Sequence, residues 1–279
     1  MDGNEYIDFW SGHGSLILGH SHPEIVQSVQ EQMSKGTHLS GSSDLEMEWA
    51  THVIDLIPSA EKVRFHSSGT EADMMALRMS RAYTGKSKVI KFQDHFHGWS
   101  DYLEADGDGL GGIPKETLST VIVLPANDAQ TLEDTLKNDS DIAAIIIEPT
   151  GAHMGLEPVL PSFLEEVRNL SSEYGVVLIF DEVVTGFRIS NGGAQKHYGI
   201  TPDLTTLAKI LGGGLPGGAV CGRADIINMI ETKDDPDYNK YRRVGHNGTF
   251  NANPLSASAG VTALSILKRD PINDQAISM

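Results

Sequence analysis

Acidic residues stand directly after two apolar runs that are typical of buried β-strands. Asp181 and Glu182 follow the run at 178–180, and Glu148 follows the run at 145–147. A buried carboxylate is costly unless it is paired, so Asp181 could hold a protonated ring nitrogen or a metal ion. Alternatively, Asp181 and Glu148 could be ordinary solvated residues at the ends of strands.

A lysine stands within a third apolar stretch. Lys209 is followed by Ile210, Leu211 and the three glycines at 212–214, which would let a ligand approach the backbone closely. A lysine whose ammonium is desolvated has a lowered pKa and becomes a nucleophile for carbonyl carbon atoms. The alternative is a surface lysine whose aliphatic stem covers apolar neighbours.

The segment Phe65–Glu71 predicts a strand, a short turn with a glycine and a helix in immediate succession. The backbone N–H groups of Gly69, Thr70 and Glu71 would be free at this helix start, and the hydroxyls of Ser68 and Thr70 would lie beside them. Such a helix N-terminus favours an anion. The alternative is a plain N-cap in which Thr70 caps the helix.

Histidines suggest a metal site as another possibility. The histidines of the pairs His20/His22 and His95/His97 are two residues apart in the sequence. His13 and His66 are two further candidate ligands. However, the sequence has neither the His-Glu-x-x-His helix pattern nor a cysteine cluster. We therefore expect no metal site.

These residues need a scaffold that brings several strand ends together. Apolar runs alternate with helical patterns and with Gly- or Pro-marked loops, which predicts an α/β fold with a mostly parallel sheet and helices on both faces. In such sheets, ligands bind beyond the carboxyl ends of the strands. Strands are expected over Lys62–His66, Lys88–Phe92, Thr120–Leu124, Ile142–Ile147, Val176–Phe180 and Gly218–Cys221. Helices are expected over Glu71–Tyr83, Ala129–Lys137, Pro161–Tyr174 and Pro254–Leu267.

Three further segments are predicted from composition. Tyr6–Phe9 resembles a strand, Asp101–Pro114 is a glycine-rich acidic loop, and Glu231–Arg243 is an exposed loop or insertion. The 279 residues carry 21 Lys+Arg and 38 Asp+Glu, for a net charge of −17, which argues against nucleic-acid or anionic-membrane partners. A single cysteine can form no internal disulfide, and no signal peptide or membrane span is evident, so we expect a cytoplasmic protein.

Six motifs occur in a fixed order, and together they resemble the class III aminotransferases, which are fold-type I enzymes that use pyridoxal 5′-phosphate. The motifs are SSGTEA at 67–72, FHG at 96–98, IIIEP at 145–149, DEVVTGFR at 181–188, TLAKILGGGLPGGA at 206–219 and GTFNANPL at 248–255. The resemblance extends from Asp2 to about Leu267 and is strongest to the glutamate-1-semialdehyde aminomutase subgroup.

The resemblance implies a catalytic pair. Lys209 would form the Schiff base with the cofactor and then move a proton between the substrate carbon and the cofactor. Asp181 would pair with the pyridinium nitrogen. The phosphate would bind at Ser68, Gly69 and Thr70.

Further cofactor contacts are implied by the same resemblance. Phe96 and Val183 would lie on opposite faces of the ring, and His97 belongs to the same motif as Phe96. Glu148 would lie near the phenolic oxygen and the substrate. Thr249 would reach the phosphate bound in the other subunit, so a homodimer is expected.

The residues expected to contact substrate are Trp10, His13, His153 and Arg188. His13 replaces an aromatic residue of the aminomutase subgroup, and His153 replaces an asparagine. Because these differences concern substrate handling, we favour an aminotransferase that moves an amino group between an amino donor and a keto or aldehyde acceptor. The alternatives are a glutamate-1-semialdehyde 2,1-aminomutase, which yields 5-aminolevulinate, and an inactive or truncated homologue.

The resemblance also divides the chain. Residues 1–44 would be an N-terminal segment that belongs to a small α+β domain, and residues 45–267 would form the large cofactor-binding domain. Residues 268–279 would begin a truncated C-terminal domain.

Overall fold

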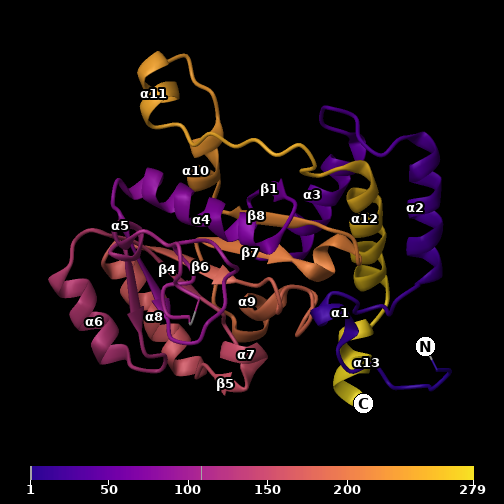
Figure 1. Cartoon of the computed structure of the whole chain (residues 1–279), viewed down its shortest axis with the longest axis horizontal. Helices are drawn as coiled ribbons and strands as arrows, with labels where there is room; N and C mark the ends of the chain where they lie inside the picture. Colours follow the sequence, from indigo (N-terminus) through magenta and orange to yellow (C-terminus); the bar gives the residue numbers. More distant parts are fainter. Residues whose placement is uncertain (1, 108) are drawn as a thin grey trace.

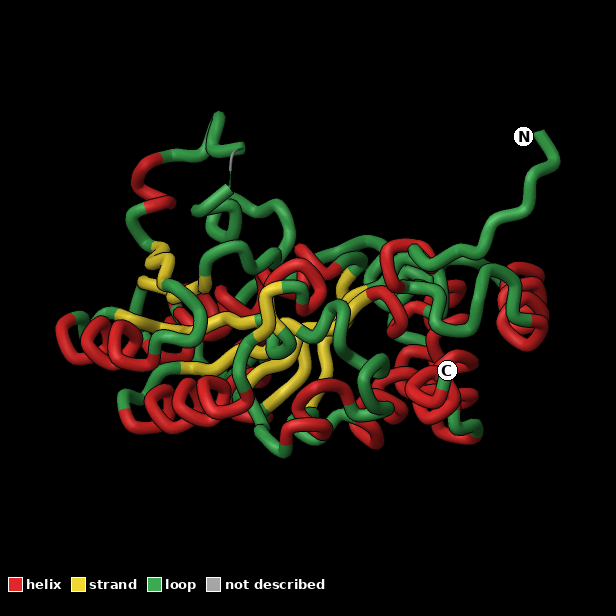
Figure 2. The backbone as a smooth tube through the Cα atoms, turned by 90° about the horizontal axis from the view of Figure 1, so that it is seen from below, coloured by secondary structure: helices red, strands yellow, loops and turns green. Residues whose placement is uncertain are grey.

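The computed structural model describes residues 2–107 and 109–279. Met1 of the expected N-terminal segment and Asp108 of the expected loop 101–114 lie outside the described residues. A seven-stranded sheet forms the middle layer, and helices cover both of its faces (Figures 1 and 2). The α/β fold class predicted from the sequence is confirmed.

The strand order across the sheet is β1-β8-β7-β6-β4-β2-β3. The strands are β1 Lys62–His66, β2 Lys88–Phe92, β3 Val121–Leu124, β4 Ile142–Ile147, β6 Val177–Asp181, β7 Leu204–Ala208 and β8 Gly218–Gly222, with the two-residue β5 Glu157–Pro158 apart from the sheet. Strand β8 is antiparallel to its neighbours β1 and β7, whereas the other pairings are parallel. The prediction of a mostly parallel sheet is therefore confirmed.

The helices differ widely in length. They are α1 Ser11–Gly14, α2 Pro23–Lys35, α3 Asp44–Leu56, α4 Gly69–Thr84, α5 Lys115–Leu118, α6 Ala129–Asn138, α7 Ala152–Gly155, α8 Pro161–Glu173, α9 Gly193–Tyr198, α10 Ala224–Ile227, α11 Pro236–Tyr241, α12 Pro254–Arg269 and α13 Ile272–Ser278, with 3-10 turns η1 Lys209–Gly212 and η2 Asn228–Ile230. No helix among the described residues is both long and apolar enough to span a lipid bilayer.

Alternate side chains of β6 face opposite helix layers. Leu178 and Phe180 belong to the core that includes α6 and α8, while Val177 and Ile179 belong to the core beneath α4. This alternation explains why the strand is an uninterrupted apolar run. A third core, around Trp49, packs α3 and α12 against the β1–β8–β7 end of the sheet. The strand ends above these cores are therefore held by packing on both faces.

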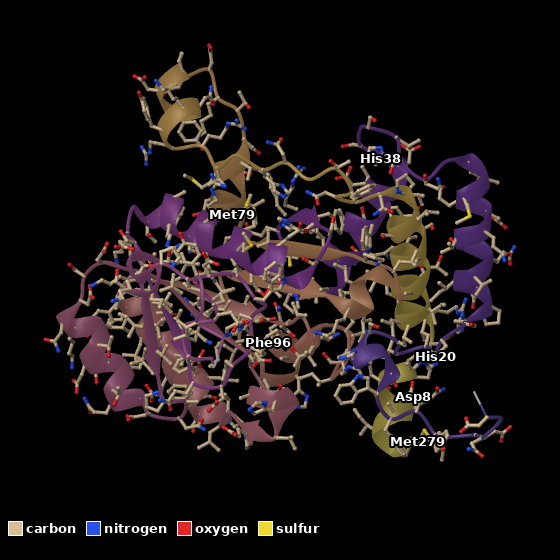
Figure 3. All side chains as sticks on the ribbon, viewed as in Figure 1. Asp8, His20, His38, Met79, Phe96 and Met279 are labelled. Atoms are coloured by element: carbon tan, nitrogen blue, oxygen red, sulfur yellow. The ribbon has the colours of Figure 1, made fainter. Side chains whose placement is uncertain are left out.

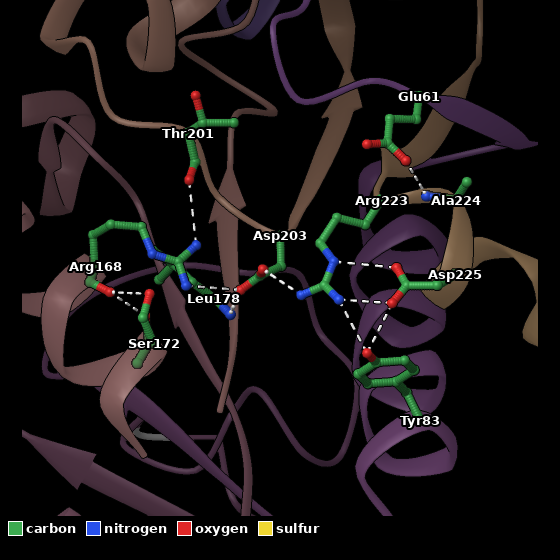
Figure 4. A network of polar contacts seen from close by, with 11 residues as sticks. Glu61, Tyr83, Arg168, Ser172, Leu178, Thr201, Asp203, Arg223, Ala224 and Asp225 are labelled. Carbon is green, nitrogen blue, oxygen red and sulfur yellow. Dashed lines mark hydrogen bonds and ion pairs between the residues drawn. The ribbon is translucent and has the colours of Figure 1, made fainter. Parts of the chain in front are cut away.

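A buried carboxylate joins chain segments near the amino ends of the central strands β6 and β7. Asp203, directly before β7, accepts hydrogen bonds from Leu178 N at 2.8 Å, Arg168 Nη2 at 3.1 Å and Arg223 Nη1 at 3.0 Å (Figure 4). The two arginines come from α8 and from the residue after β8. Asp203 thus joins three neighbouring segments at the amino end of β7.

Several sequence expectations need correction. Strand β7 and helices α2, α3 and α9 were not predicted, and β6 begins and ends one residue later than expected. Tyr6–Phe9 is not a strand, because no described segment pairs with it and the side chains of Tyr6 and Phe9 are 84% and 91% exposed. The segment Glu231–Arg243 contains α11, which stands away from the sheet (Figure 1) and begins at the cap residue Asp235. The described part of Asp101–Pro114 is loop, as predicted.

Candidate active site

Four elements end or begin around one cavity of about 290 Å³. Asp181 ends β6, Lys209 follows β7, and Glu148 follows β4, while Gly69 begins α4. All four residues line the cavity, although up to 140 positions separate them in the sequence. The parallel strands bring these side chains together because their carboxyl ends share one edge of the sheet.

Asp181 is held by two donors. His97 Nδ1 lies 2.7 Å from Asp181 Oδ2, and Val183 N donates to Asp181 Oδ1 at 3.0 Å. The His97 and Asp181 side chains are 0% and 4% exposed. This pairing holds the Asp181 carboxylate in one orientation and places a proton on His97 Nδ1. A fixed carboxylate that is shielded from solvent therefore lines the cavity.

Lys209 stands in an unusual backbone conformation beside this anion. Its φ of 50° lies in the left-handed region, at the junction between β7 and η1. Burial lowers the pKa of the Lys209 ammonium, while Asp181, Glu148 and Asp73 act in the opposite direction. A lysine that loses its proton more readily is a better nucleophile toward a carbonyl carbon. The alternative of a solvated surface lysine does not fit this position.

Glu148 is a buried acid with a raised pKa. Burial and the nearby charge of Asp181 raise the pKa of Glu148 to about 8, although Phe96 N donates to Glu148 Oε2 at 3.0 Å. The side chain therefore carries a proton in much of the neutral population. It can donate a hydrogen bond as well as accept one.

Asp73 is a cavity residue that the sequence did not reveal, because an acidic residue in the first turn of the helix expected from Glu71 resembles ordinary helix capping. It is 1% exposed, and its Oδ1 has no hydrogen-bond partner among the described residues. Burial, followed by the charge of Asp181, raises the pKa of Asp73 well above its ordinary value. The only signal in the sequence was its spacing of four residues from Gly69, which places both on one face of α4.

The start of α4 can receive an anion. Ser68 Oγ accepts from Glu71 N at 3.2 Å, as in a capping box, while Glu71 Oε2 accepts from the N–H of Ser67, the residue before the cap, at 2.7 Å. The cap is therefore Ser68 and not Thr70. The backbone N–H groups of Gly69 and Thr70 have no acceptor in the described part of the chain. They remain available at the positive end of the helix.

Close packing around this helix start requires glycine. A Cβ on Gly98 would lie 2.3 Å from Thr70 Oγ1, and a Cβ on Gly69 would lie 2.9 Å from Val183 Cγ2. Val183 and Phe96 both line the cavity, and Phe96 is 66% exposed. The expected ring contacts are thus brought to the same place as the helix start.

A second cavity of about 450 Å³ adjoins the first and shares Phe96, Glu148 and Lys209 with it. His13 and His153, two of the expected substrate residues, line this second cavity. Because the two cavities share Lys209, a molecule in the second would lie next to the reactive amine.

Two other expected substrate residues lie outside both cavities. Arg188 is half-buried and its Nη2 donates to Gly14 O, while Trp10 is 60% exposed and packs edge-on against His13 at 5.0 Å between ring centroids. Trp10 therefore touches a lining residue without lining the cavity itself.

Thr249 lies in a third cavity, beside His38. The Thr249 carbonyl oxygen is 2.5 Å from His38 Nε2, and Figure 3 shows His38 well separated from Phe96. Thr249 does not line the cofactor cavity of its own chain. As for the histidines, no group of three His, Cys, Asp or Glu side chains suited to a metal ion occurs within residues 2–107 and 109–279.

A mostly parallel sheet, a lysine after one central strand, an aspartate at the end of the next and a helix start beside them define the fold-type I class of pyridoxal-phosphate-dependent enzymes. Within that class, the chain belongs to the class-III aminotransferase family, whose family model matches residues 1–279.

Individual relatives agree with this assignment. The chain is 45% identical to a glutamate-1-semialdehyde 2,1-aminomutase of Desulfotalea psychrophila, over 96% of this chain and 63% of that protein. It is 43% identical to the Sulfolobus acidocaldarius protein of the same name, over 99% of this chain and 66% of that protein. The chain thus spans about two thirds of the length of these relatives.

Solved structures show the same fold. An omega-transaminase from Sphaerobacter thermophilus superimposes with a TM-score of 0.89 at 38% identity, covering 97% of this chain and 64% of that one. A transaminase solved with PLP bound gives a TM-score of 0.89 at 33% identity, with the same coverage.

Proposed function

We propose that this chain is the cofactor-binding part of a pyridoxal 5′-phosphate-dependent aminotransferase, which moves an amino group between an amino donor and a keto or aldehyde acceptor. The observation that carries the proposal is the single cavity shared by Lys209, Asp181 and the start of α4. Since the chain spans 63% to 66% of its curated relatives, the activity is proposed for the whole protein.

The residues present fit this cofactor. A phosphate needs N–H donors, and those of Gly69 and Thr70 are unused within the described residues. A protonated ring nitrogen needs a shielded anion, and Asp181 is one, with lone pairs left beyond its two hydrogen bonds. Phe96 and Val183 would contact the ring faces.

When bound, the cofactor supplies an electron-withdrawing ring that stabilises negative charge on the substrate carbon next to the amine. Lys209 would hold the cofactor through Nζ and, once a substrate amine takes its place, would move a proton to and from that carbon. Asp181 would keep the ring nitrogen protonated, and His97 would hold the Asp181 carboxylate in place. Glu148 would donate a hydrogen bond near the phenolic oxygen.

The attachment to Lys209 can be tested without measuring turnover. Full-length protein is incubated with pyridoxal 5′-phosphate, reduced with borohydride and digested, and the modified peptide is identified by mass spectrometry. We expect the modification on Lys209, its loss in Lys209→Ala and its persistence in Lys196→Ala, which changes an exposed lysine. Modification of another lysine, or a visible absorbance band that persists in Lys209→Ala, would overturn the assignment.

An aminomutase is the second candidate, and the identities of 45% and 43% to two such proteins favour it. The two reactions differ in their need for a second substrate. An aminotransferase given one amino donor stops after releasing one keto product per site. Conversion of glutamate-1-semialdehyde to 5-aminolevulinate without any second substrate would decide for the mutase.

A homodimer is part of the proposal. Thr249 is exposed and far from the cofactor cavity of its own chain, which leaves it free to reach a neighbouring one. If it does, mixing a Lys209→Ala subunit with a Thr249→Ala subunit will restore one complete site per mixed dimer. Sedimentation gives the oligomeric state independently.

The expected domain division and location also remain proposals. The division into 1–44, 45–267 and 268–279 is supported by the large core, which residues from α3 to α12 build. A cytoplasmic location is supported by the lone cysteine, Cys221, which is buried and unpaired.

A further inference from the structure

His95 is a buried histidine whose ring proton can be located from its surroundings. The side chain is 1% exposed and packs near Phe92. Glu148 N donates a hydrogen bond to His95 Nδ1 at 3.0 Å. An Nδ1 that accepts a hydrogen bond carries no proton, so the neutral ring carries its proton on Nε2.

Other observations agree with a neutral ring. Burial, with additional contributions from the neighbouring His97, Lys91 and His153 side chains, lowers the pKa of His95 to about 3. The carboxylate oxygen Oε2 of Glu148 lies 3.9 Å from His95 Nδ1, which is too far for a hydrogen bond. His95 is thus a hydrogen-bond acceptor at one nitrogen and a donor at the other.

The donor has no partner. His95 Nε2 is buried and makes no hydrogen bond with any described residue. A buried donor without an acceptor lowers stability by about 1–3 kcal/mol, so binding of an acceptor at this position would be favourable. His95 also lines the second cavity, where it lies with Lys209 and His153. A molecule that reaches Lys209 through this cavity passes the His95 side chain.

The charges around the cavity limit what this partner can be. Asp94 and Glu104 also line this cavity. The buried ammonium of Lys91 is already used by Asp106 and by Leu103 O. A substrate carboxylate would therefore meet two like charges there, whereas a hydroxyl or carbonyl oxygen would not.

We propose that His95 Nε2–H is a specificity-determining donor that binds an uncharged oxygen of the substrate, a hydroxyl or carbonyl placed away from the reacting amine. The inference rests on the proposed aminotransferase function and narrows its substrates to oxygen-bearing amines. No proton transfer by His95 is involved.

Two variants separate the two nitrogens. In His95→Asn, the amide oxygen can replace Nδ1 as the acceptor for Glu148 N, but no donor remains at the Nε2 position. In His95→Gln, the longer amide can place an N–H near that position. A purely structural role for His95 predicts that both variants affect all substrates equally.

The experiment compares aminopropanol, aminobutanol and aminopentanol with the alkylamine of the same carbon count, using the full-length cofactor-loaded protein. The bleaching of the visible cofactor band gives the rate constant for each amine. We expect the wild type to prefer at least one amino alcohol and His95→Asn to lose about tenfold of that preference, chiefly through KM. His95→Gln should restore part of it. An unchanged preference, or an equal loss for amino alcohol and alkylamine, would overturn the proposal.

A second readout does not depend on turnover. Nitrogen NMR of ¹⁵N-histidine-labelled protein reports which ring nitrogen of His95 is protonated, with His95→Asn giving the assignment. We expect a proton on Nε2 whose resonance shifts when the amino alcohol is added and does not shift with the alkylamine. A proton on Nδ1 would refute the inference. If the cofactor band itself never forms, the proposed function fails, and this spectrum still tests His95.

Discussion

His97 Nδ1 lies 2.7 Å from Asp181 Oδ2, and both side chains are withdrawn from solvent. The two residues are 84 positions apart in the sequence. The contact gives Asp181 a fixed orientation, which would let its other oxygen atom face a protonated ring nitrogen.

Removing this donor should weaken cofactor binding. In His97→Phe, Asp181 loses a charge-assisted hydrogen bond, and we expect the Kd for pyridoxal 5′-phosphate to rise at least tenfold, equivalent to about 1.4 kcal/mol. Absorbance titration of the apoprotein measures the Kd. His197→Phe, which alters an exposed histidine on α9, is the control. Equal Kd values in wild type and His97→Phe would show that the hydrogen bond from His97 to Asp181 does not contribute to cofactor binding.

The raised pKa of Glu148 predicts a pH-dependent stability. The pKa of Glu148 is about 8 in the folded chain and about 4.5 in the unfolded chain. The folded state therefore holds this proton more tightly, and the resulting contribution to the free energy of unfolding is complete below pH 4.5 and is lost as the pH rises through 8. Glu148→Gln keeps an acceptor for Phe96 N and cannot ionise. Its stability relative to wild type should therefore increase by a few kcal/mol, on the order of the shift, between these pH values. Urea unfolding of the apoproteins across pH measures this difference, and a difference independent of pH would contradict the prediction.

Gly98 should tolerate no side chain. Its φ is 83°, and a Cβ would lie 2.3 Å from Thr70 Oγ1 and 2.9 Å from Thr70 Cα. Gly98→Ala should displace the start of α4, lower stability by about 1–3 kcal/mol and raise the Kd for the cofactor. Gly85→Ala is a matched control, since Gly85 has a φ of 70° at the other end of α4 but open space around it. It should lower stability by about 1 kcal/mol and leave cofactor binding unchanged.

Asp203 should support the fold and not the site. Asp203→Ala leaves Arg168 Nη2 and the amide of Leu178 without their acceptor, so we expect a loss of about 3 kcal/mol in the free energy of unfolding. Asp225→Ala removes an exposed partner of Arg223 (Figure 4). This substitution should change the free energy of unfolding by less than about 1 kcal/mol. Cofactor stoichiometry should be unchanged in both variants. An Asp203→Ala protein as stable as Asp225→Ala would refute the prediction.

The sequence by itself determined those strands and helix starts that depend only on residues close together in the chain. The apolar run Ile142–Ile147 becomes a strand with the predicted bounds, because burial on both faces leaves no polar position within it. The serine and glutamate around Gly69 start a helix through their own side chains. The motif order was sufficient to assign the family, and the strand-end positions of Lys209 and Asp181 were readable as chemistry.

The tertiary structure alone decided which side chains meet. Strand β7 was missed because Leu204–Ala208 carries two threonines, and only its place between β6 and β8 makes it a buried strand. The spacing of Asp73 from Gly69 and the His95/His97 pair did not predict that the Asp73 and His95 side chains are both buried with an unsatisfied polar atom, because this burial arises from contacts with elements far away in the chain. Hydrogen bonding and desolvation depend on distances between such elements, and those distances exist only after the sheet has assembled.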